Sequence, residues 1–455
     1  MQFVCYLTQL LNLLTSNEIL LIINAPFIML DRKDISIRPD YYKVELAKRV
    51  ADEQLSADIA RIVELDNEIN GLDQQIQTRN QRKNALSQLV KLKKLSPDKA
   101  REEANLIPDI SSVEERIKEL RAQLIQILLL LPNLPLPDTP VGGKDENVVV
   151  RYNSQKPEFD FSIRDHVQLA EDLGLIDYER GRKLSGKGFP VYTEKGAYLQ
   201  RAIIQYCIDY HHSNGYRLLA VPHILNHECG VGAGQFPKFA DDVLRIAESS
   251  HGEMDKFLIP TAETAIANLY AGELLSVDQL PIKHFAESSC FRNEYATHAD
   301  ERGIARTTEF KKVEMFQIVH PNASLQSFEE MIADVEALVK GLELHYRVSR
   351  LATRDCSASM QATYDVEVWI PSMETYKEVS SASLAGDYQA RRTNTRFKDI
   401  DKKNKYPHFL NASGLAVPRI FMAILEQGQQ ENGKISLPSV LRQYMYGDEV
   451  LELST

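Results

Sequence analysis

Residues 290–319 read CFRNEYATHADERGIARTTEFKKVEMFQIV, and this stretch decides the fold of the larger part of the chain. Residues 291–294 and 304–319 have the composition of strands, and the polar residues 295–303 separate them. Two strand-like runs joined by a polar segment predict an antiparallel hairpin. Helical and strand-like segments around it are mixed without strict β-α-β alternation, so the sequence does not predict a parallel sheet.

The second strand of this hairpin would place three chemically useful side chains on one face. Side chains of a strand alternate between its two faces, so Arg306, Phe310 and Glu314 are expected to share one of them. A cation, an aromatic ring and a carboxylate are the groups needed to hold a nucleotide and an amine. Neither a G-x-G-x-x-G nor a G-x-x-x-x-G-K-[ST] motif occurs in the sequence, so an ATP site here would work without a P-loop.

A coiled-coil arm is predicted upstream of the hairpin. From residue 62 to residue 76, apolar residues recur at spacings of three and four, and residues 113–127 repeat the pattern. This spacing is that of the a and d positions of a coiled coil. Between the two stretches, Ser96-Pro97-Asp98 supplies a cap residue and a proline for a helix start. The pattern predicts two long antiparallel helices, each roughly 50–75 Å long at 1.5 Å per residue.

The end of this arm is strongly basic. Residues 79–101 contain eight lysines and arginines and one acid, Asp98, a net charge of +7, whereas the whole chain carries −11. A basic end on an otherwise acidic chain is typical of localised contact with a polyanion. An ordinary solvated hairpin tip is the alternative. The basic residues singled out for contact are Arg79, Arg82, Lys83, Lys91, Lys93 and Lys94.

Domain limits follow from the connecting segment. Residues 131–140, LPNLPLPDTP, form a stiff proline-rich stretch that ends at a flexible glycine pair, Gly142 and Gly143. A domain boundary is therefore expected there. The expected divisions are an extension over 1–28, a helical arm over 29–131, a linker over 132–147 and a second domain over 148–455.

Composition excludes several classes of protein. A net charge of −11 over 455 residues excludes a uniformly basic protein that coats nucleic acid. The five cysteines are scattered with no C-x-x-C pair, so we expect reduced thiols, a cytoplasmic location and no structural zinc. Residues 1–28 are apolar but lack a basic start and are interrupted by polar residues, so neither a signal peptide nor a membrane span is predicted. A mis-set start upstream of Met29 is the preferred explanation.

Four segments, in order along the chain, resemble motifs of the class II aminoacyl-tRNA synthetases. Their amino-acid sequences are similar to those of the seryl-tRNA synthetases. The hairpin sequences CFRNE and FKKVE resemble motif 2. Residues 258–263, LIPTAE, resemble the serine-binding T-x-E loop, and residues 378–381, EVSS, resemble the ATP-binding strand. Residues 411–419, NASGLAVPR, resemble motif 3. Each motif alone is weak, but four in order are strong, and the similarity covers about residues 29–450.

The resemblance implies an α+β fold and an enzyme. A long antiparallel α-helical arm that binds tRNA would precede a catalytic domain of mainly antiparallel sheet flanked by helices. The enzyme would activate L-serine with ATP, release pyrophosphate and transfer serine to the 3′ end of tRNA(Ser). Residues 198–222 resemble motif 1, which implies a homodimer. The resemblance leaves open whether selenocysteine tRNA, tRNA(Sec), is charged as well.

The resemblance also implies roles in nucleotide binding. Arg292 would hold the α-phosphate and the serine carboxylate, and Phe310 would stack on adenine. Glu378 would bind a Mg²⁺ that bridges the phosphates, with Ser380 pointing the same way along the strand. The residues expected to bind ATP are Arg292, Asn293, Glu294, Arg306, Phe310, Glu378, Val379, Ser380, Ser381 and Arg419, and among them Arg292, Glu378 and Arg419 are expected to be catalytic.

Serine recognition is expected from two places in the chain. Thr261 and Glu263 would take the ammonium group, and Glu314 with Ser413 would take the hydroxyl group. A pocket built from hydrogen-bonding groups should reject alanine strongly, because its acceptors would be left unpaired. The residues expected to bind serine are Thr261, Ala262, Glu263, Glu314 and Ser413.

Two other interpretations remain. A paralogue could activate an amino acid without charging tRNA, and a catalytically silent homologue could only bind RNA. The motif 2 loop, residues 295–303, departs from the small-residue pattern of the family, and Thr307-Thr308-Glu309 replaces a more usual basic and amide run. Taken singly, Arg292 and Glu294 could also form an ordinary ion pair. The basic arm argues against the paralogue, and the complete set of site residues argues against the silent homologue.

Overall fold

The computed structural model describes residues 30–50, 54–105, 107, 109–246, 256–293 and 303–453. The extension over residues 1–28 lies outside these described residues. Contacts divide the chain into two units, residues 1–131 and 132–455, each of which is described by itself. Among the described residues, no helix is long and apolar enough to cross a membrane.

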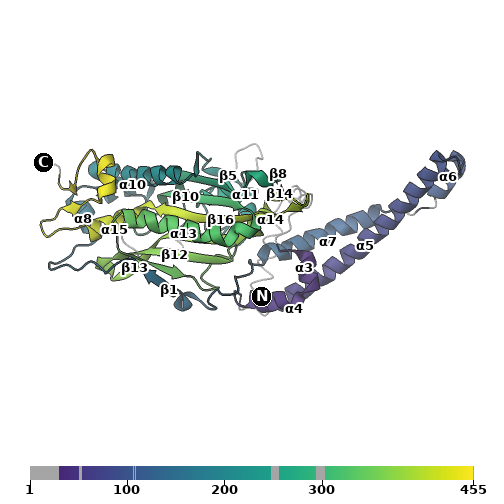
Figure 1. Cartoon of the computed structure of the whole chain (residues 1–455), viewed down its shortest axis with the longest axis horizontal. Coiled ribbons are helices and arrows are strands. Elements are labelled where there is room, and N and C mark those ends of the chain that lie inside the picture. Colours follow the sequence, from purple (N-terminus) through teal and green to yellow (C-terminus); the bar gives the residue numbers. More distant parts are fainter. Residues whose placement is uncertain are drawn as a thin grey trace. The chain divides into compact units, whose positions relative to one another are not determined.

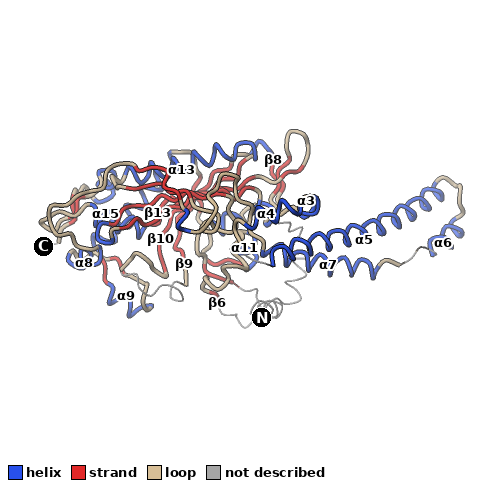
Figure 2. The backbone as a smooth tube through the Cα atoms, turned by 90° about the horizontal axis from the view of Figure 1, so that it is seen from below, coloured by secondary structure: helices blue, strands red, loops and turns tan. Residues whose placement is uncertain are grey.

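The first unit is helical. Its helices are α3 (Arg32–Ile37), α4 (Pro39–Ala47), α5 (Gln54–Lys91), α6 (Pro97–Asn105) and α7 (Ser111–Leu130). α5 is the long first helix that the apolar spacing predicted. The expectation of one long second helix is wrong, because that stretch divides into α6 and α7, with α6 beside the C-terminal end of α5 (Figure 2). The sequence of the interval between them includes Pro108, and proline disfavours the interior of a helix because it lacks a backbone N–H.

α5 and α7 pack side by side in antiparallel directions. Arg61 of α5 donates to Gln123 of α7 at 3.1 Å, and Arg116 of α7 pairs with Glu68 of α5 at 2.9 Å, so residue numbers rise along one helix as they fall along the other. The apolar seam buries residues of both helices: Leu55, Ile59, Ile62, Leu65 and Ile69 on α5, and Ile117, Leu120, Leu124, Ile125 and Leu128 on α7.

The second unit is built on an eight-stranded sheet (Figure 1). Its strands, in spatial order, are β1 (Val148–Tyr152), β11 (Tyr346–Arg350), β12 (Ala362–Ile370), β13 (Thr375–Gly386), β16 (His408–Ala416), β10 (Glu309–Val319), β9 (Ile282–Phe291) and β4 (Arg217–Leu219). All neighbours pair antiparallel except β4 and β9, which are parallel. The predicted mainly antiparallel sheet and the α+β class are therefore confirmed, and a hairpin is present, but its first strand, β9, ends at Phe291, whereas residues 291–294 were predicted to form it.

Three helices form the main core with this sheet. α10 (Glu194–Ser213), α13 (Ser324–Gly341) and α15 (Val417–Gln427) run alongside the central strands (Figure 1). Leu199, Val335 and Ile420, one from each helix, are 0% exposed in one apolar cluster with sheet residues. A smaller apolar cluster joins other sheet residues to α12 (Glu263–Ala267) and α14 (Tyr388–Arg392). The sheet is thus a rigid base on which side chains can be placed accurately.

Shorter elements complete the second unit. The helices are α8 (His166–Asp172), α9 (Tyr178–Ser185) and α11 (His227–Gly232). The strands are β2 (Ile176–Asp177), β3 (Val191–Tyr192), β5 (Ile224–Asn226), β6 (Arg245–Ile246), β7 (Lys256–Leu258), β8 (Leu274–Ser276), β14 (Arg396–Lys398), β15 (Asn404–Lys405), β17 (Ile435–Ser436) and β18 (Val450–Leu451).

The apolar seam of the arm gives a first prediction. Leu120 is 0% exposed in α7, whereas Leu130 of the same helix is 45% exposed. We expect Leu120→Ala to lower the free energy of unfolding of the arm by about 2–4 kcal/mol through reduced burial and a cavity, and Leu130→Ala to lower it by less than about 1 kcal/mol. Urea unfolding of the full chain, followed by far-UV circular dichroism, measures both. Equal decreases would show that the seam does not hold the arm.

Candidate active site

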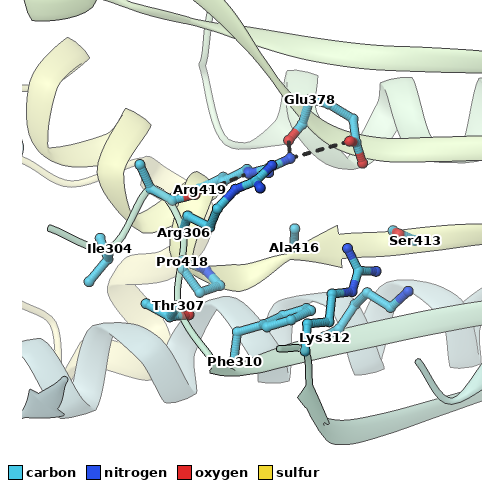
Figure 3. A pocket seen from close by; sticks show the side chains of 12 residues that line it. Ile304, Arg306, Thr307, Phe310, Lys312, Glu378, Ser413, Ala416, Pro418 and Arg419 are labelled. Atoms are coloured by element: carbon cyan, nitrogen blue, oxygen red, sulfur yellow. Dashed lines mark hydrogen bonds and ion pairs between the residues drawn. The ribbon is translucent and has the colours of Figure 1, made fainter. Parts of the chain in front are cut away.

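A cavity of about 540 Å³ lies in the second unit and gathers residues from all four sequence motifs. The expected site residues that line it are Thr261, Glu263, Arg292, Asn293, Arg306, Glu314, Glu378, Ser381 and Ser413. A smaller pocket of about 60 Å³ shares several of these residues and adds Phe310 and Arg419 (Figure 3). Segments up to about 150 residues apart in the sequence are therefore brought to one place.

Strand β10 supplies one wall of the site. Because its side chains alternate, Phe310, Lys312 and Glu314 lie on one face. Phe310 is paired with Cys290 near the end of β9, so Arg292, two residues further on, comes to lie with its guanidinium 5.2 Å from the centre of the Phe310 ring. A cation and a flat aromatic surface are thus adjacent, as binding of a nucleotide requires.

Arg306 reaches the site in a different way from the one expected. β10 begins at Glu309 and not at Ile304, so Arg306 does not belong to the strand and is not placed by its alternation. It lies on the segment that precedes the strand, beside Arg419 (Figure 3). That segment is held at Thr308, whose N–H donates to the carbonyl of Gly188 at 2.9 Å and whose carbonyl accepts from the N–H of Arg292 at 2.9 Å.

Arg419 and Glu378 form a clamp across the pocket. Arg419, near the start of α15, donates from Nη1 to the Glu378 carbonyl at 2.7 Å and to its Oε2 at 3.3 Å (Figure 3). Burial of Glu378 favours its protonated form, but the positive charges of Arg419, Arg292 and Lys312 outweigh burial and lower the pKa of Glu378. The site therefore keeps a carboxylate ionised beside fixed cations. Across the next strand, burial and the neighbouring Glu378 raise the pKa of Asp365.

A bulge in β13 corrects the expectation for Ser380. Pairing with β12 shifts register between Val366 and Glu367, so Val379 has no partner and the alternation changes phase. Ser380 is consequently 0% exposed and donates to the Ser413 carbonyl at 2.5 Å, while Ser381 lines the cavity with Glu378. The prediction that Ser380 points with Glu378 is wrong. Val379 packs into the main apolar core and does not line the cavity.

Buried charges line the other end of the cavity. Glu314 is 0% exposed, and its Oε2 contacts Lys312 Nζ and accepts from Thr261 Oγ1 at 3.0 Å. Thr261 Oγ1 also accepts from the N–H of Glu263 at 3.1 Å. Burial and the nearby Glu314 charge raise the pKa of Glu263 to about 7. Ala262 packs into the smaller apolar cluster and does not line the cavity.

Lys312 and Gln389 are among the residues of this site that sequence reasoning missed. Lys312 is 6% exposed and lies between Phe310 and Glu314, so the two-residue period of the strand could have found it. Gln389 is 1% exposed, and its Nε2 donates to Glu263 Oε1 at 2.8 Å and to the Ala233 carbonyl at 2.9 Å. Gln389 comes from α14, more than a hundred residues away from Glu263, and no local pattern marks it.

Several of the predicted site residues do not line this cavity or are not among the described residues. Glu294 and residues 295–302 of the motif 2 loop lie outside the described residues. The six basic residues of the arm belong to the first unit, where Lys91, Lys93 and Lys94 are exposed. Within the part of the chain that the structure describes, no group of three or more His, Cys, Asp or Glu side chains could hold a metal ion. Glu378 and Ser381 nevertheless offer two oxygen donors on one cavity wall.

Comparison with known proteins finds relatives over most of the chain. Models of the seryl-tRNA synthetase N-terminal domain and of the tRNA synthetase class II core domain (G, H, P, S and T) match residues 29–135 and 246–428. Serine–tRNA ligase 2 of Clostridium acetobutylicum is 45% identical over 425 residues, which cover 91% of this chain and 99% of that protein. Serine–tRNA ligase of Psychrobacter cryohalolentis is 38% identical, with 90% and 97% covered. The crystal structure of seryl-tRNA synthetase from Pyrococcus horikoshii complexed with ATP has a TM-score of 0.84 at 31% identity and covers 94% of this chain and 100% of that chain.

The raised pKa of Glu263 gives a second prediction. Its value of about 7 lies above the ordinary 4.5, so the folded protein binds this proton more tightly than the unfolded chain, and stability falls as pH rises from about 4.5 to about 7. Glu263→Gln removes that decrease, so it should raise the free energy of unfolding at pH 8 by up to about 3 kcal/mol and by almost nothing at pH 4.5. Urea unfolding at both pH values measures this difference. A gain that does not depend on pH would contradict the assignment.

Proposed function

The chain belongs to the seryl-tRNA synthetase family, and from that membership we propose how its cavity carries out the reaction. The enzyme uses ATP to join L-serine to tRNA, with AMP and pyrophosphate as products. One observation carries the assignment of residues. A single cavity holds Glu263, Arg292, Glu314 and Glu378, which come from three of the motifs and offer charges for the ammonium, phosphate, hydroxyl and metal partners of the reaction.

Arginine side chains act on the phosphates of ATP. In the first step a serine carboxylate oxygen attacks the α-phosphorus, the bond from that phosphorus to the oxygen bridging to the β-phosphate breaks, and pyrophosphate leaves. Negative charge accumulates on phosphoryl oxygens, which donors held in place beforehand stabilise. Arg292 would contact the α-phosphate and the serine carboxylate while adenine stacks on Phe310. Arg419 and Arg306 would neutralise the outer phosphates.

Magnesium fits the acidic side of the cavity. Glu378 and Ser381 offer two hard oxygen donors, which suits an ion that takes one or two protein ligands and completes its shell with phosphate oxygens and water. When bound, the ion would neutralise charge on the phosphates as pyrophosphate leaves. Arg419 contributes by keeping Glu378 ionised and by fixing its position.

Serine would be recognised by the buried carboxylates. Glu263, held by Gln389, would accept the ammonium group, and Glu314 would accept the serine hydroxyl. Both Glu314 oxygens already have donors, Lys312 and Thr261 on one and Asn411 at 3.4 Å on the other, so the carboxylate is fixed in orientation. Alanine lacks the hydroxyl and could not make this hydrogen bond to the buried carboxylate, so we expect it to be rejected by roughly 10⁴-fold or more.

Transfer and assembly involve the first unit and a second chain. A ribose hydroxyl of the terminal adenosine would attack the carbonyl carbon of the adenylate, with release of AMP. The basic tip of the arm would bind phosphates of tRNA(Ser), and α10 would lie in a homodimer interface. A cytoplasmic location is supported by the scattered cysteines, which form no C-x-x-C pair in the sequence.

Pyrophosphate exchange with ATP across all twenty amino acids, followed by charging of total tRNA, tests this function. Exchange with serine alone together with charging is expected. Exchange without charging would instead identify a paralogue that only activates the amino acid. Failure of exchange would leave a silent RNA-binding protein.

Replacement of the hydroxyl-binding carboxylate gives a third prediction. Glu314→Gln keeps the size of the side chain but removes its charge, so we expect the KM for serine to rise roughly 10- to 100-fold, the equivalent of one hydrogen bond to a charged group. The KM for ATP should stay within about twofold. Exchange kinetics measure both constants. Arg292→Ala is the comparison, since it should abolish exchange at any serine concentration; an unchanged serine KM in Glu314→Gln would refute the assignment.

The basic tip gives a fourth prediction. Replacing Lys91, Lys93 and Lys94 with alanine should leave serine-dependent exchange unchanged and weaken tRNA(Ser) binding. The slope of the logarithm of the binding constant against the logarithm of the salt concentration should decrease in magnitude by about one for each lysine that binds a phosphate in the unsubstituted protein. Lys118→Ala, on α7 outside this tip, is the matched control and should bind tRNA normally. Filter binding at several salt concentrations measures the slopes. Equal slopes in all variants would show that the tip does not bind the phosphates of tRNA.

A further inference from the structure

A hydrogen bond between two strands connects the cavity wall to a carboxylate behind it. Asp365 of β12 is the register partner of Ser381 of β13, and Ser381 Oγ donates to Asp365 Oδ1 at 2.6 Å. Ser381 lines the cavity together with Glu378, whereas Asp365 is not among the lining residues. The distance is that of a strong O–H···O bond to a carboxylate.

This bond determines what Ser381 can offer to the cavity. A serine hydroxyl has one proton and two acceptor lone pairs. Ser381 donates its proton to Asp365 Oδ1 at 2.6 Å and also lies within hydrogen-bond reach of Glu378, so a lone pair of its oxygen is left for a ligand in the cavity. The β13 bulge has already placed Ser381 on the same wall as Glu378, so Asp365 completes a pair of oxygen donors by fixing the rotation of the second one.

We propose that Asp365 is a positioning residue for the magnesium ion that accompanies ATP, and that it acts by holding the Ser381 hydroxyl with its oxygen presented to the ion. This inference rests on the proposed function of the cavity. Carboxylates behind metal ligands commonly orient those ligands, and their removal typically weakens metal binding by 10- to 100-fold. Asp365 would contact neither the nucleotide nor serine.

The same two strands provide a matched control. Two residues along the ladder, Thr363 of β12 faces Ser383 of β13, and their hydroxyl oxygens lie 2.9 Å apart. This pair also joins β12 to a residue of the cavity wall, but it contains no carboxylate and does not include Glu378 or Ser381. Thr363→Val therefore removes a cross-strand hydrogen bond of the same kind without changing the proposed magnesium ligands.

Calorimetric titration of the full chain with a non-hydrolysable ATP analogue, in excess Mg²⁺ and in excess EDTA, tests the proposal. Asp365→Ala should weaken binding roughly 10- to 100-fold in Mg²⁺ and leave it unchanged in EDTA. Asp365→Asn, which keeps an acceptor oxygen, should weaken it less. Thr363→Val should match the wild type under both conditions. The Mg²⁺ concentration that half-saturates exchange should rise in Asp365→Ala by the same factor as the affinity falls.

Other results would overturn the inference. Equal weakening of Asp365→Ala in Mg²⁺ and in EDTA would mean that the residue only supports the fold, and equal affinities of wild type and variant in Mg²⁺ would mean that it does not position a ligand. A wild-type protein that exchanges pyrophosphate with serine while Asp365→Ala behaves normally would refute only this inference. A wild-type protein without such exchange would refute the proposed function itself.

Discussion

The pairing of β10 between β9 and β16 is the constraint on which the rest of the site depends. It fixes the register in which Phe310, Lys312 and Glu314 face the cavity and the smaller pocket while Val313 and Met315 face the main core. A slip of one residue would exchange these two sets, placing valine and methionine in the cavity and two charged groups in the apolar core. Burial of the core face therefore enforces the arrangement of the polar face. The chemistry of the site is held by hydrophobic packing on the opposite side of the same strand.

The bulge in β13 changes locally the alternation of side chains between the two faces of the strand. A regular strand from Glu378 would turn Ser380 toward the cavity and Ser381 away from it. The unpaired Val379 reverses this phase and sends Ser380 to the Ser413 carbonyl of the next strand. One irregular residue thus both exposes the Ser381 hydroxyl and adds a bond between β13 and β16. Bulges are frequent beside active sites for this reason.

Sequence alone predicts the elements whose patterns are local and regular. The hairpin, the long helix α5 and the mainly antiparallel sheet follow from spacing, composition and resemblance, and the structure confirms them. The errors concern where elements begin and end and which way side chains point. Arg306 precedes β10, and the bulge turns Ser380 away from the cavity. The second arm helix is divided into α6 and α7. These features are decided by a partner strand or by a proline within a long helical pattern. Gln389 was not predicted as a site residue because only the folded chain brings α14 close to Glu263.

The two ends of the cavity shift the pKa values of their carboxylates in opposite directions, and in the proposed mechanism this difference serves to distinguish substrates. Fixed arginines lower the pKa of Glu378, so its charge is present before any ligand arrives. Burial and Glu314 raise the pKa of Glu263, so its charge is costly until a cation comes close. In its proposed role, Glu263 gains its full stabilisation only when an ammonium group fills the pocket. A ligand without an ammonium group leaves that cost in place, so in this proposal selectivity arises from a buried charge that the hydrogen bond from Gln389 does not fully offset.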